Sequence, residues 1–419
     1  MSATATILSE VNDLAKDYYS EILQPLTNVA TALKAQRGRL ENFQYTGRKV
    51  IFSLKMTNGG GVGNVGSRKT LPEAKAGTFD QAEARIVRTY ARMAVDLFDA
   101  ERTKAERGSY RPLITELMDD RMTAINLESN RQGFSAGDGK IALIGGTPGA
   151  SATQTFRLDY AVTNGGNGVR HIVPGDFLAI YDNTPTLIGR RTVSTVDPAA
   201  QTVTFTSSIT TTATTNFVTK STADTDNFTE TENLGLLSAM VQTGTFQAVP
   251  IGGHYKAKRV HNSGTLRPIT DPLVMQTVLA IKAESGELPT LAITRPGVTL
   301  NYSSIFLPIR RINGQDVTLK GGYNPVAVIQ TGGATIPVLE DVDCPDSRMF
   351  FENSKYVKNI DLVGTQWADK DGAQFRQVND QDAIEGYIRQ YWGTVYTRPN
   401  ALGVLEDLED VAALDRIGA

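Results

Sequence analysis

Hydrophobic residues in the first 40 positions recur at steps of three and four, which is the spacing of one face of a helix. The pattern predicts an amphipathic arm, broken at Pro25, whose apolar side needs a partner. The apolar positions are Leu8, Val11, Ala15, Tyr18, Ile22, Leu26, Val29 and Leu33.

The pattern then changes to strict alternation, which is typical of half-buried strands. Apolar residues alternate with Lys and Ser from Val50 to Met56, and with Arg from Val87 to Val95. We expect these two runs to form long antiparallel strands. The glycine-rich and charged stretch between them is longer than the roughly 12 to 15 residues at which structureless loops become uncommon, so it should form a projecting hairpin.

A helical pattern begins at Pro112 and ends near Gly133. Proline suits the first turn and glycine the end of a helix. At about 1.5 Å per residue the helix would span roughly 30 Å. It leads into an Ala-Gly-Asp-Gly turn and the apolar run from Ile141 to Ile144.

From residue 150 to 226 the composition shifts to Thr, Val, Gly and Ser, in short alternating runs separated by turn sequences. This predicts an all-β insertion, which at about 75 residues should lean on neighbouring structure. A mixed pattern resumes at Leu234, with a helix from Asp271 to Glu284 followed by short strands. Extended segments dominate from Met349 to Val404, so the fold class is α+β.

Composition excludes several classes of protein. The 419 residues are too many for one compact domain by the usual prior, and the hydrophobic content of 40% is that of a globular chain. A net charge of −3 argues against a surface that mainly grips nucleic acid. One cysteine, no signal sequence and no long apolar run lead us to expect neither export, nor a membrane span, nor an N-terminal pro-segment.

The glycines Gly61, Gly63 and Gly66 match a dinucleotide-binding pattern, but Pro72 follows where a helix should begin. Nucleotide binding is therefore disfavoured. The simpler interpretation is that the glycines give the hairpin freedom to settle on a neighbour.

No coherent catalytic or metal site emerges. The three histidines form no ligand motif with Cys344, and the acidic pairs at 119 to 120 and 341 to 343 are most simply solvated charges. The acidic EDLED tail from Glu406 is interpreted in the same way. We expect no enzyme activity, no cofactor and no metal.

Basic residues cluster from Arg85 to Arg111, interleaved with acidic ones. Mixed signs favour salt bridges between subunits over a DNA groove, because alternating charge sets register and cancels long-range attraction to phosphate.

The order of these features resembles the Hong Kong 97-type phage capsid fold, over nearly the whole chain. The segments that carry the resemblance are LESNRQGFSAGDGKIALIGG after the long helix, DPLVMQTVLAIKAESGELPTLAIT, and the final RPNALGVLEDL. The large β insertion departs from the minimal fold. We expect it on the outer surface, bracing neighbouring subunits.

The resemblance implies a division of the chain. In sequence order this is an N-arm (1 to 43), an E-loop hairpin (44 to 92), a peripheral domain (93 to 149) with its spine helix (112 to 133), the inserted β-rich domain (150 to 226), an axial domain (227 to 345), peripheral return strands (346 to 397) and a C-terminal return to the axial domain (398 to 419).

The function implied by the resemblance is that of a major capsid protein of a tailed double-stranded DNA phage, assembled in the host cytoplasm into an icosahedral shell. Its partners would be copies of itself in hexamers and pentamers, packaged DNA without sequence-specific contacts and no membrane. Scaffolding, portal and decoration proteins are further candidates. An encapsulin-like compartment and a β-rich surface or adhesion protein are the alternatives.

Residues expected to make contacts between subunits come from the arm, the hairpin and the basic cluster. They are Leu8, Val11, Phe52, Leu54, Gly61, Gly63, Gly66, Arg68, Lys69, Arg88 and Arg92. Some relatives cross-link a hairpin lysine to an asparagine of another subunit, but no local motif here selects such a pair.

Overall fold

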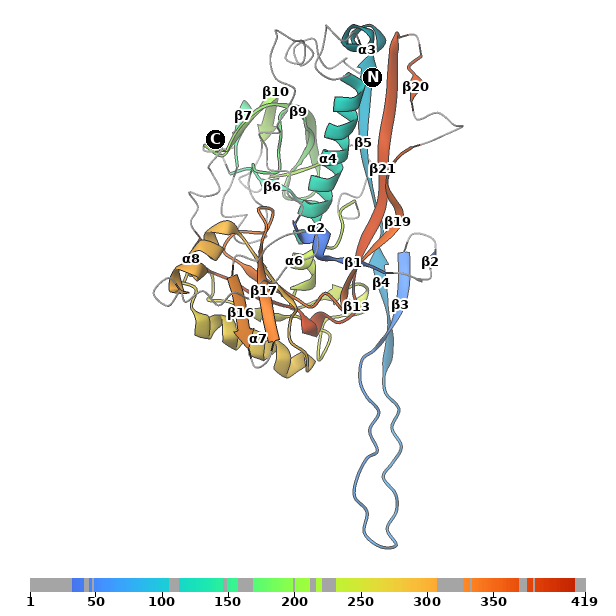
Figure 1. Ribbon diagram of the computed structural model, residues 1–419, viewed down its shortest axis with the longest axis vertical. Coiled ribbons are helices and arrows are strands. Elements are labelled where there is room, and N and C mark those ends of the chain that lie inside the picture. The colour runs from blue at the N-terminus through green and yellow to red at the C-terminus, as the bar shows by residue number, and fades with distance from the viewer. Residues whose placement is uncertain are drawn as a thin grey trace. The chain divides into compact units, whose positions relative to one another are not determined.

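A computed structural model describes residues 32 to 40, 45 to 46, 49 to 104, 113 to 145, 149 to 156, 169 to 198, 200 to 211, 216 to 220, 231 to 306, 327 to 331, 334 to 368, 375 to 379 and 381 to 410 (Figure 1). The described chain forms two compact units. The first contains Val87–Asn130 and Asp361–Trp392, and the second contains Ala32–Ile86, Arg131–Ile360 and the chain from Gly393 onward. No helix in these ranges is long and apolar enough to cross a membrane.

The first unit is a helix packed on a sheet. Its elements are β5 (Val87–Asp96), α3 (Leu97–Lys104), most of α4 (Leu113–Phe134), and the parts of β19 (Val357–Trp367), β20 (Arg376–Gln377) and β21 (Ala383–Tyr396) that lie in it. Strands β5 and β21 pair antiparallel from Val87↔Trp392 to Asp96↔Ala383. One face of the pair packs against α4, through Met93, Val95 and Ile384 on the strands and Leu117 and Met118 on the helix.

The strand pairing corrects one expectation. The run from Val87 to Val95 is a strand, but it pairs with β21 and not with the run that begins at Val50. The partner of β3 (Lys49–Lys55) is β4 (Phe79–Arg85), in the register Lys49↔Arg85 to Lys55↔Phe79. Residues 79 to 85, FDQAEAR, carry little β-branched or aromatic content, so propensity did not mark them as a strand. The hairpin therefore ends at residue 86 and not at residue 92.

The long helix is confirmed within one residue of each expected end, as α4 runs from Leu113 to Phe134. The expected glycine turn follows it. Gly137 and Gly139 have φ of 73° and 75°, and a Cβ on Gly137 would lie 2.7 Å from the Leu234 side chain. Glycine is therefore needed at 137 for both backbone shape and space.

The second unit is built on a mixed six-stranded sheet in the order β14-β22-β18-β15-β17-β16. The strands are β14 (Lys258–Val260), β15 (Leu291–Thr294), β16 (Ala327–Thr331), β17 (Ala334–Glu340), β18 (Met349–Glu352) and β22 (Gly403–Leu405). Strand β22 lies between β14 and β18, so residues 403 to 405 form an interior strand of this sheet.

Two helices accompany this sheet. The predicted helix is confirmed as α7 (Asp271–Ser285), with proline in its first turn and Gly286 in the left-handed conformation at its end. Helix α8 (Pro296–Phe306) was not predicted. Its sequence, PGVTLNYSSIF, is rich in residues of modest helix propensity, so burial of Val298 and Tyr302 in the core must select the helix.

The smaller elements are α2 (Ala32–Gln36), β1 (Gly38–Arg39), β2 (Tyr45–Thr46), α6 (Leu236–Ala239), β12 (Thr245–Phe246), β13 (Val249–Pro250) and the 3₁₀ turn η4 (Pro399–Ala401).

The insertion is a six-stranded antiparallel sheet in the order β6-β11-β8-β9-β10-β7. The strands are β6 (Ala142–Leu143), β7 (Gly149–Thr155), β8 (Phe177–Tyr181), β9 (Leu187–Asp197), β10 (Thr202–Thr211) and β11 (Phe217–Thr219). The two edge strands meet, because Ile144 bridges Phe156 and the Gly145 amide donates to the Thr155 carbonyl at 2.8 Å. The sheet therefore curls into a small barrel that is joined at one end of its two edge strands.

The barrel has its own core, and it begins earlier than expected. The core contains Ile141, Ile144, Phe156, Leu178, Ile180, Val193, Val203, Phe205, Ile209 and Val218. The apolar run from Ile141 to Ile144 supplies the first strand, so the boundary lies near residue 141 and not at residue 150. The barrel contacts the loop after β17, where Arg170 donates to the Val342 carbonyl at 2.8 Å and His171 lies 3.7 Å from Asp343.

Two acidic residues expected in solvent are buried. Glu406 follows the interior strand β22, and its carboxylate binds Arg259 at 2.6 Å and Arg348 at 3.2 Å. Asp341 accepts a hydrogen bond from the Leu33 amide at 2.9 Å. Both carboxylates are paired because they lie at the ends of interior strands, where an unpaired charge would be costly.

The barrel core yields a stability prediction. Replacing buried Phe205 with Ala should lower the free energy of unfolding by about 3 to 5 kcal/mol, because it removes a buried ring and leaves a cavity. Phe177→Ala, on a side chain that is 45% exposed, is the matched control and should cost less than about 1 kcal/mol. Urea unfolding followed by circular dichroism measures both. Equal losses would contradict a barrel with its own core.

Candidate assembly surfaces

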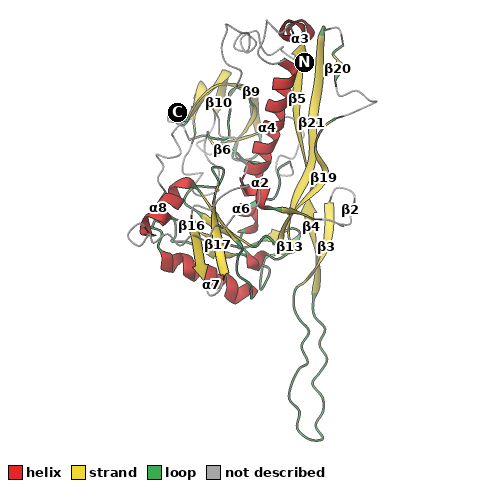
Figure 2. Cartoon of the chain, in the orientation of Figure 1, coloured by secondary structure: helices red, strands yellow, loops and turns green. Residues whose placement is uncertain are grey.

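Beyond β3 and β4 the hairpin continues as a narrow exposed ribbon. Residues 57 to 76 are all exposed, and the ribbon is drawn as loop in Figure 2. The Thr57 and Thr78 hydroxyls lie 2.7 Å apart at its base, and Gly60 bridges Lys75 further out. These contacts join the two arms of the segment to each other.

Three glycines allow this close approach. A Cβ would lie 2.5 Å from the Lys75 carbonyl oxygen at Gly59, 2.3 Å from that of Glu73 at Gly61, and 2.5 Å from that of Thr57 at Gly77. Gly61 also has φ of 93°. These distances are shorter than any side chain tolerates, so Gly61 shapes the ribbon and does not merely loosen it. This corrects the sequence interpretation at that position.

The glycines nearer the tip have more room. A Cβ on Gly63 would lie 3.4 Å from the Pro72 ring, and one on Gly66 would lie 3.8 Å from the Lys69 side chain. The tip closes where the Lys69 amide donates to the Gly66 carbonyl at 3.3 Å, with Arg68 at φ 59°. A side chain would therefore fit at Gly63 and Gly66, and their conformational freedom stays a prediction.

The ribbon presents apolar and basic side chains to solvent. Val62 is 99% exposed and Leu71 is 79% exposed. Arg68, Lys69 and Lys75 outnumber the one carboxylate of the ribbon, Glu73. Exposed apolar side chains on a segment without a core of its own are typical of a surface that another protein covers.

At the base of the hairpin the side chains are already packed within this chain. Leu54 is 8% exposed and lies in the core with Ala82 and Phe350, and Phe52 packs at the edge of that core. The Glu83 amide donates to the Gln247 carbonyl at 2.9 Å. Leu54 therefore anchors the hairpin to its own subunit, contrary to the expectation that it faces a neighbour.

The remaining expected contact residues are distributed differently. Leu8 and Val11 lie outside the described residues. Arg92 forms an ion pair with Glu385, and the Arg88 guanidinium lies 5.9 Å from the centre of the Tyr391 ring, both within the first unit.

A polar junction that the sequence analysis missed ties the hairpin and barrel to the end of α4. The Glu232 carboxylate pairs with Arg131 and accepts hydrogen bonds from the Ser135 hydroxyl at 2.8 Å and the Gly139 amide at 3.2 Å. Arg85, at the end of β4, donates to the Gly137 carbonyl at 3.2 Å and the Glu232 carbonyl at 3.0 Å.

The neighbouring Asn233 extends this junction to β21. Its side-chain amide donates to the Thr394 hydroxyl at 2.8 Å, and its carbonyl oxygen accepts from the Thr394 amide at 3.1 Å. No local signal could have revealed these contacts, because the partners are about 100 and 160 residues away.

Charges in the junction perturb one another. Burial, and then the nearby Glu232 carboxylate, raise the pKa of Asp138 above its usual value. In the barrel loop Asp182 shows the opposite behaviour, because hydrogen bonds from Thr186 and Thr184 lower the pKa of its carboxyl.

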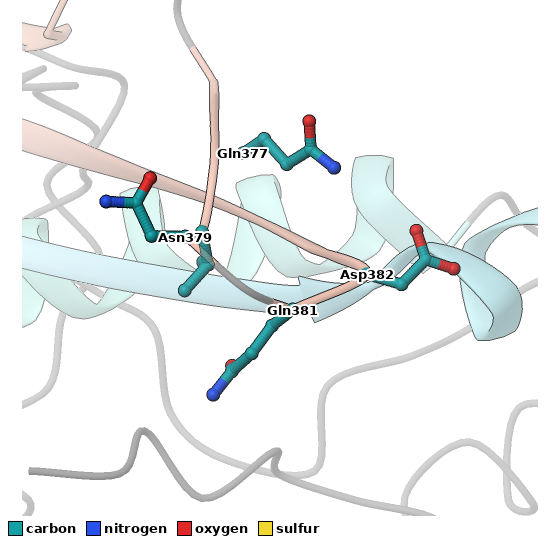
Figure 3. Close-up of a pocket in the computed structure, with 5 residues that line it drawn as sticks. Gln377, Asn379, Gln381 and Asp382 are labelled. Carbon is teal, nitrogen blue, oxygen red and sulfur yellow. The ribbon is translucent and has the colours of Figure 1, made fainter.

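The described surface offers little for chemistry. A shallow hollow where β20 turns into β21 is lined by Gln377, Val378, Asn379, Gln381 and Asp382 (Figure 3). It contains one carboxylate among amide side chains and no nucleophile or base partner. Among the described residues, no three His, Cys, Asp or Glu side chains gather as metal ligands.

The ribbon geometry predicts an asymmetry between glycines. Gly61→Ala should distort the ribbon, because the new methyl group collides with the Glu73 carbonyl in a left-handed backbone. Gly66→Ala, which has space, should leave the ribbon intact. Limited proteolysis within residues 57 to 77 should show faster cleavage of the Gly61 variant alone. Equal cleavage of both variants would refute the role assigned to Gly61.

The two perturbed aspartates predict opposite pH dependences. The folded protein binds the Asp138 proton more tightly than the unfolded chain does, so ionisation costs stability as pH rises through the Asp range. Asp138→Asn should therefore raise the melting temperature at pH 7, with the gain vanishing below about pH 3. Asp182→Asn should lower the melting temperature at pH 7, and that loss should also vanish in acid. Thermal melts from pH 3 to 7 test both, and parallel shifts of the same sign would contradict the assignments.

No protein-family model matches the sequence, and no curated protein matches it in sequence. Solved structures do match. The capsid subunit of cyanophage A-1(L) aligns with a TM-score of 0.55 at 10% identity, over 93% of this chain and 96% of that chain.

Two further solved structures span nearly the whole chain. The capsid of a native GTA particle aligns with a TM-score of 0.50 at 11% identity, over 97% of this chain and 100% of that one. An encapsulin from Synechococcus elongatus PCC 7942 aligns with a TM-score of 0.41, which is too low to support an argument about function. With its long helix, hairpin and mixed sheet in the expected order, the chain has the Hong Kong 97-type phage capsid fold.

Proposed function

We propose that this chain is the major capsid protein of a tailed double-stranded DNA phage. The observation that carries the proposal is the match of fold to a phage capsid subunit over 93% of the chain. In this role each copy needs only modest affinity at each contact, because a closed shell holds every copy through several neighbours.

The exposed ribbon supports self-assembly. Its apolar and basic residues, Val62, Leu71, Arg68 and Lys69, have no core of their own and would be buried on an adjacent subunit. We assign the same role to Leu8 and Val11 of the arm. Leu54 is reassigned to holding the hairpin on its own subunit.

The wider setting belongs to the same proposal. Copies would form hexamers and pentamers around DNA held without sequence-specific contacts, in a virion assembled in the host cytoplasm. Scaffolding, portal and decoration proteins are candidate partners, and the barrel is assigned to the outer surface. We propose no enzymatic activity and no cofactor, since no described group of residues combines a nucleophile, a base and an oxyanion site.

Two alternatives differ in what they predict. An encapsulin-like compartment shares the fold but would enclose protein cargo and not a genome. A β-rich adhesion protein is disfavoured, because the Thr-rich stretch forms a single inserted barrel within a capsid fold.

Expression in a bacterial host followed by negative-stain microscopy tests the function. Uniform icosahedral shells of the purified chain are the expected result. Shells from infected cells should contain double-stranded DNA, whereas protein cargo would identify a compartment and a purely monomeric chain would refute both readings.

The ribbon gives a sharper assembly test. Replacing residues 61 to 74 with the two-residue turn Asn-Gly keeps the Gly60 and Lys75 bridge and should leave the subunit folded. Without the exposed tip, we expect shell yield to fall at least about tenfold, as expected for loss of roughly 1.4 kcal/mol per contact. Sedimentation measures the yield and circular dichroism the fold. Normal assembly of the shortened chain would show that the ribbon is not an assembly element.

A further inference from the structure

The outward face of the β5 and β21 pair carries a regular array of arginine and tyrosine. Side chains alternate between the two faces of a strand, and α4 packs against one face. Gln390 points toward α4, since its side chain accepts a hydrogen bond from the Ser129 hydroxyl at 2.9 Å. Trp392 lies on the same face and donates to the Thr89 hydroxyl on the neighbouring strand at 3.2 Å. The opposite face, called here the Arg–Tyr face, consists of Arg88, Tyr90, Arg92, Tyr387, Arg389 and Tyr391.

The register interleaves these residues. Arg88 lies opposite Tyr391, Tyr90 opposite Arg389, and Arg92 opposite Tyr387. Arg88, Arg389 and Arg92 therefore follow one another along the β5 and β21 pair at steps of two residues, or about 6.7 Å. The sequence did not reveal this row, because Arg389 joins it from a strand almost 300 positions away.

The tyrosines form a rigid platform. The ring centres of Tyr90 and Tyr387, and of Tyr90 and Tyr391, are each 6.0 Å apart in edge-to-face geometry. The Tyr90 and Tyr391 hydroxyls lie 3.1 Å apart. Edge-to-face packing is a favoured arrangement of aromatic rings, so the three tyrosines stabilise one another.

The face nevertheless remains open in a single copy. Tyr90 is 51% exposed and the Arg92 side chain is 62% exposed. The buried Nε of Arg389 has no hydrogen-bond partner among the described residues. The carboxylates in the row are Glu385, which pairs with Arg92, and Asp96 at its end, so Arg88 and Arg389 give the middle of the face its positive charge.

The composition of the face favours a protein partner over nucleic acid. Tyrosine and arginine are the residues enriched at the energetic centres of protein interfaces, while lysine is depleted there. The Arg–Tyr face contains no lysine. Its partner should carry carboxylates at a matching spacing beside apolar side chains.

The first 31 residues of this chain have that chemistry. They contain four carboxylates and one lysine, and the carboxylates Glu10, Asp13, Asp17 and Glu21 are spaced by three, four and four residues. On the helix expected from the sequence these would form one stripe, with steps of about 6 Å between Asp13, Asp17 and Glu21. That step is close to the spacing of the arginine row, and the apolar residues of the arm flank the stripe.

We propose that the Arg–Tyr face docks the acidic N-terminal segment, residues 1 to 31, of a second copy of this chain. Carboxylates of the arm pair with Arg88 and Arg389, and apolar arm residues cover the tyrosine platform. A second copy is the source because the proposed shell brings copies side by side, and docking of the same copy's own arm is the alternative outcome that the cross-linking test distinguishes. The inference rests on the proposed shell assembly and specifies one of its contacts.

Cross-linking in assembled shells tests the contact. The full chain carrying Tyr90→Cys and Asp17→Cys is treated with a short bis-maleimide linker and separated on a denaturing gel. The native Cys344 is buried and will not compete. The expected product is a covalent dimer and higher ladder. The matched control, Thr153→Cys with Asp17→Cys, places the thiol on the exposed barrel surface and should give no ladder.

Charge exchange distinguishes pairing from mere proximity. Arg88→Glu with Arg389→Glu should reduce the dimer yield at least about tenfold, because it sets like charges opposite each other. Adding Asp13→Arg and Glu21→Arg should restore the yield. The neutral pair Arg88→Gln with Arg389→Gln removes the charges without reversing them and should give an intermediate yield. The melting temperature of each variant shows whether a lower yield comes from misfolding.

The outcomes separate this proposal from the proposed function. Shells that form without the cross-linked ladder, a cross-link confined to single chains, or no restoration by charge exchange would each overturn the docking proposal. Absence of shells from the unmodified chain would instead overturn the proposed function.

Discussion

The carboxylate of Glu232 is the point on which the second unit depends most. It is buried and accepts from Arg131, Ser135 and the Gly139 amide, so the end of α4, the turn before the barrel and the segment at Glu232 are held by one charge. Removing either side would leave a buried group without its partner, at a cost of roughly 3 to 5 kcal/mol for a broken buried ion pair. The last turn of α4, from Arg131 onward, and the start of the barrel therefore share one anchoring carboxylate.

Backbone approach at this junction is as tight as the charge pairing. A Cβ on Gly235 would lie 2.2 Å from the Ser135 nitrogen, and one on Gly393 would lie 2.2 Å from the Arg85 carbonyl oxygen. Main chains that touch so closely leave no space for rearrangement by side-chain rotation. The hairpin therefore leaves this junction from a closely packed base at Arg85.

The sequence predicts those features whose determinants lie close together along the chain. The helices α4 and α7 were identified because proline and glycine mark their ends within a few residues of the periodic pattern. Strand β4 was not identified because its sequence has low strand propensity. The buried roles of Asp341 and Glu406 and the Arg–Tyr face were missed because each depends on partners distant in sequence. The order of elements could be recognised from local patterns. The contacts of candidate site residues could not be predicted in this way, so the burial of Leu54 in the core of its own subunit was missed.

The barrel also bears on how such a chain can acquire new parts. Its first and last strands, β6 and β11, pair directly, with Ala142 opposite Val218. The chain thus enters and leaves the barrel at adjacent points. The rest of the second unit needs to accommodate only two neighbouring chain ends, as it would for a short loop. Loop-closure entropy grows only slowly with length, so exchanging the barrel for another self-contained domain with neighbouring ends costs the host fold little. Residues 141 to 219 are in that sense an interchangeable module, through which a lineage could vary this part of the protein while the parent sheet and helix stay constant.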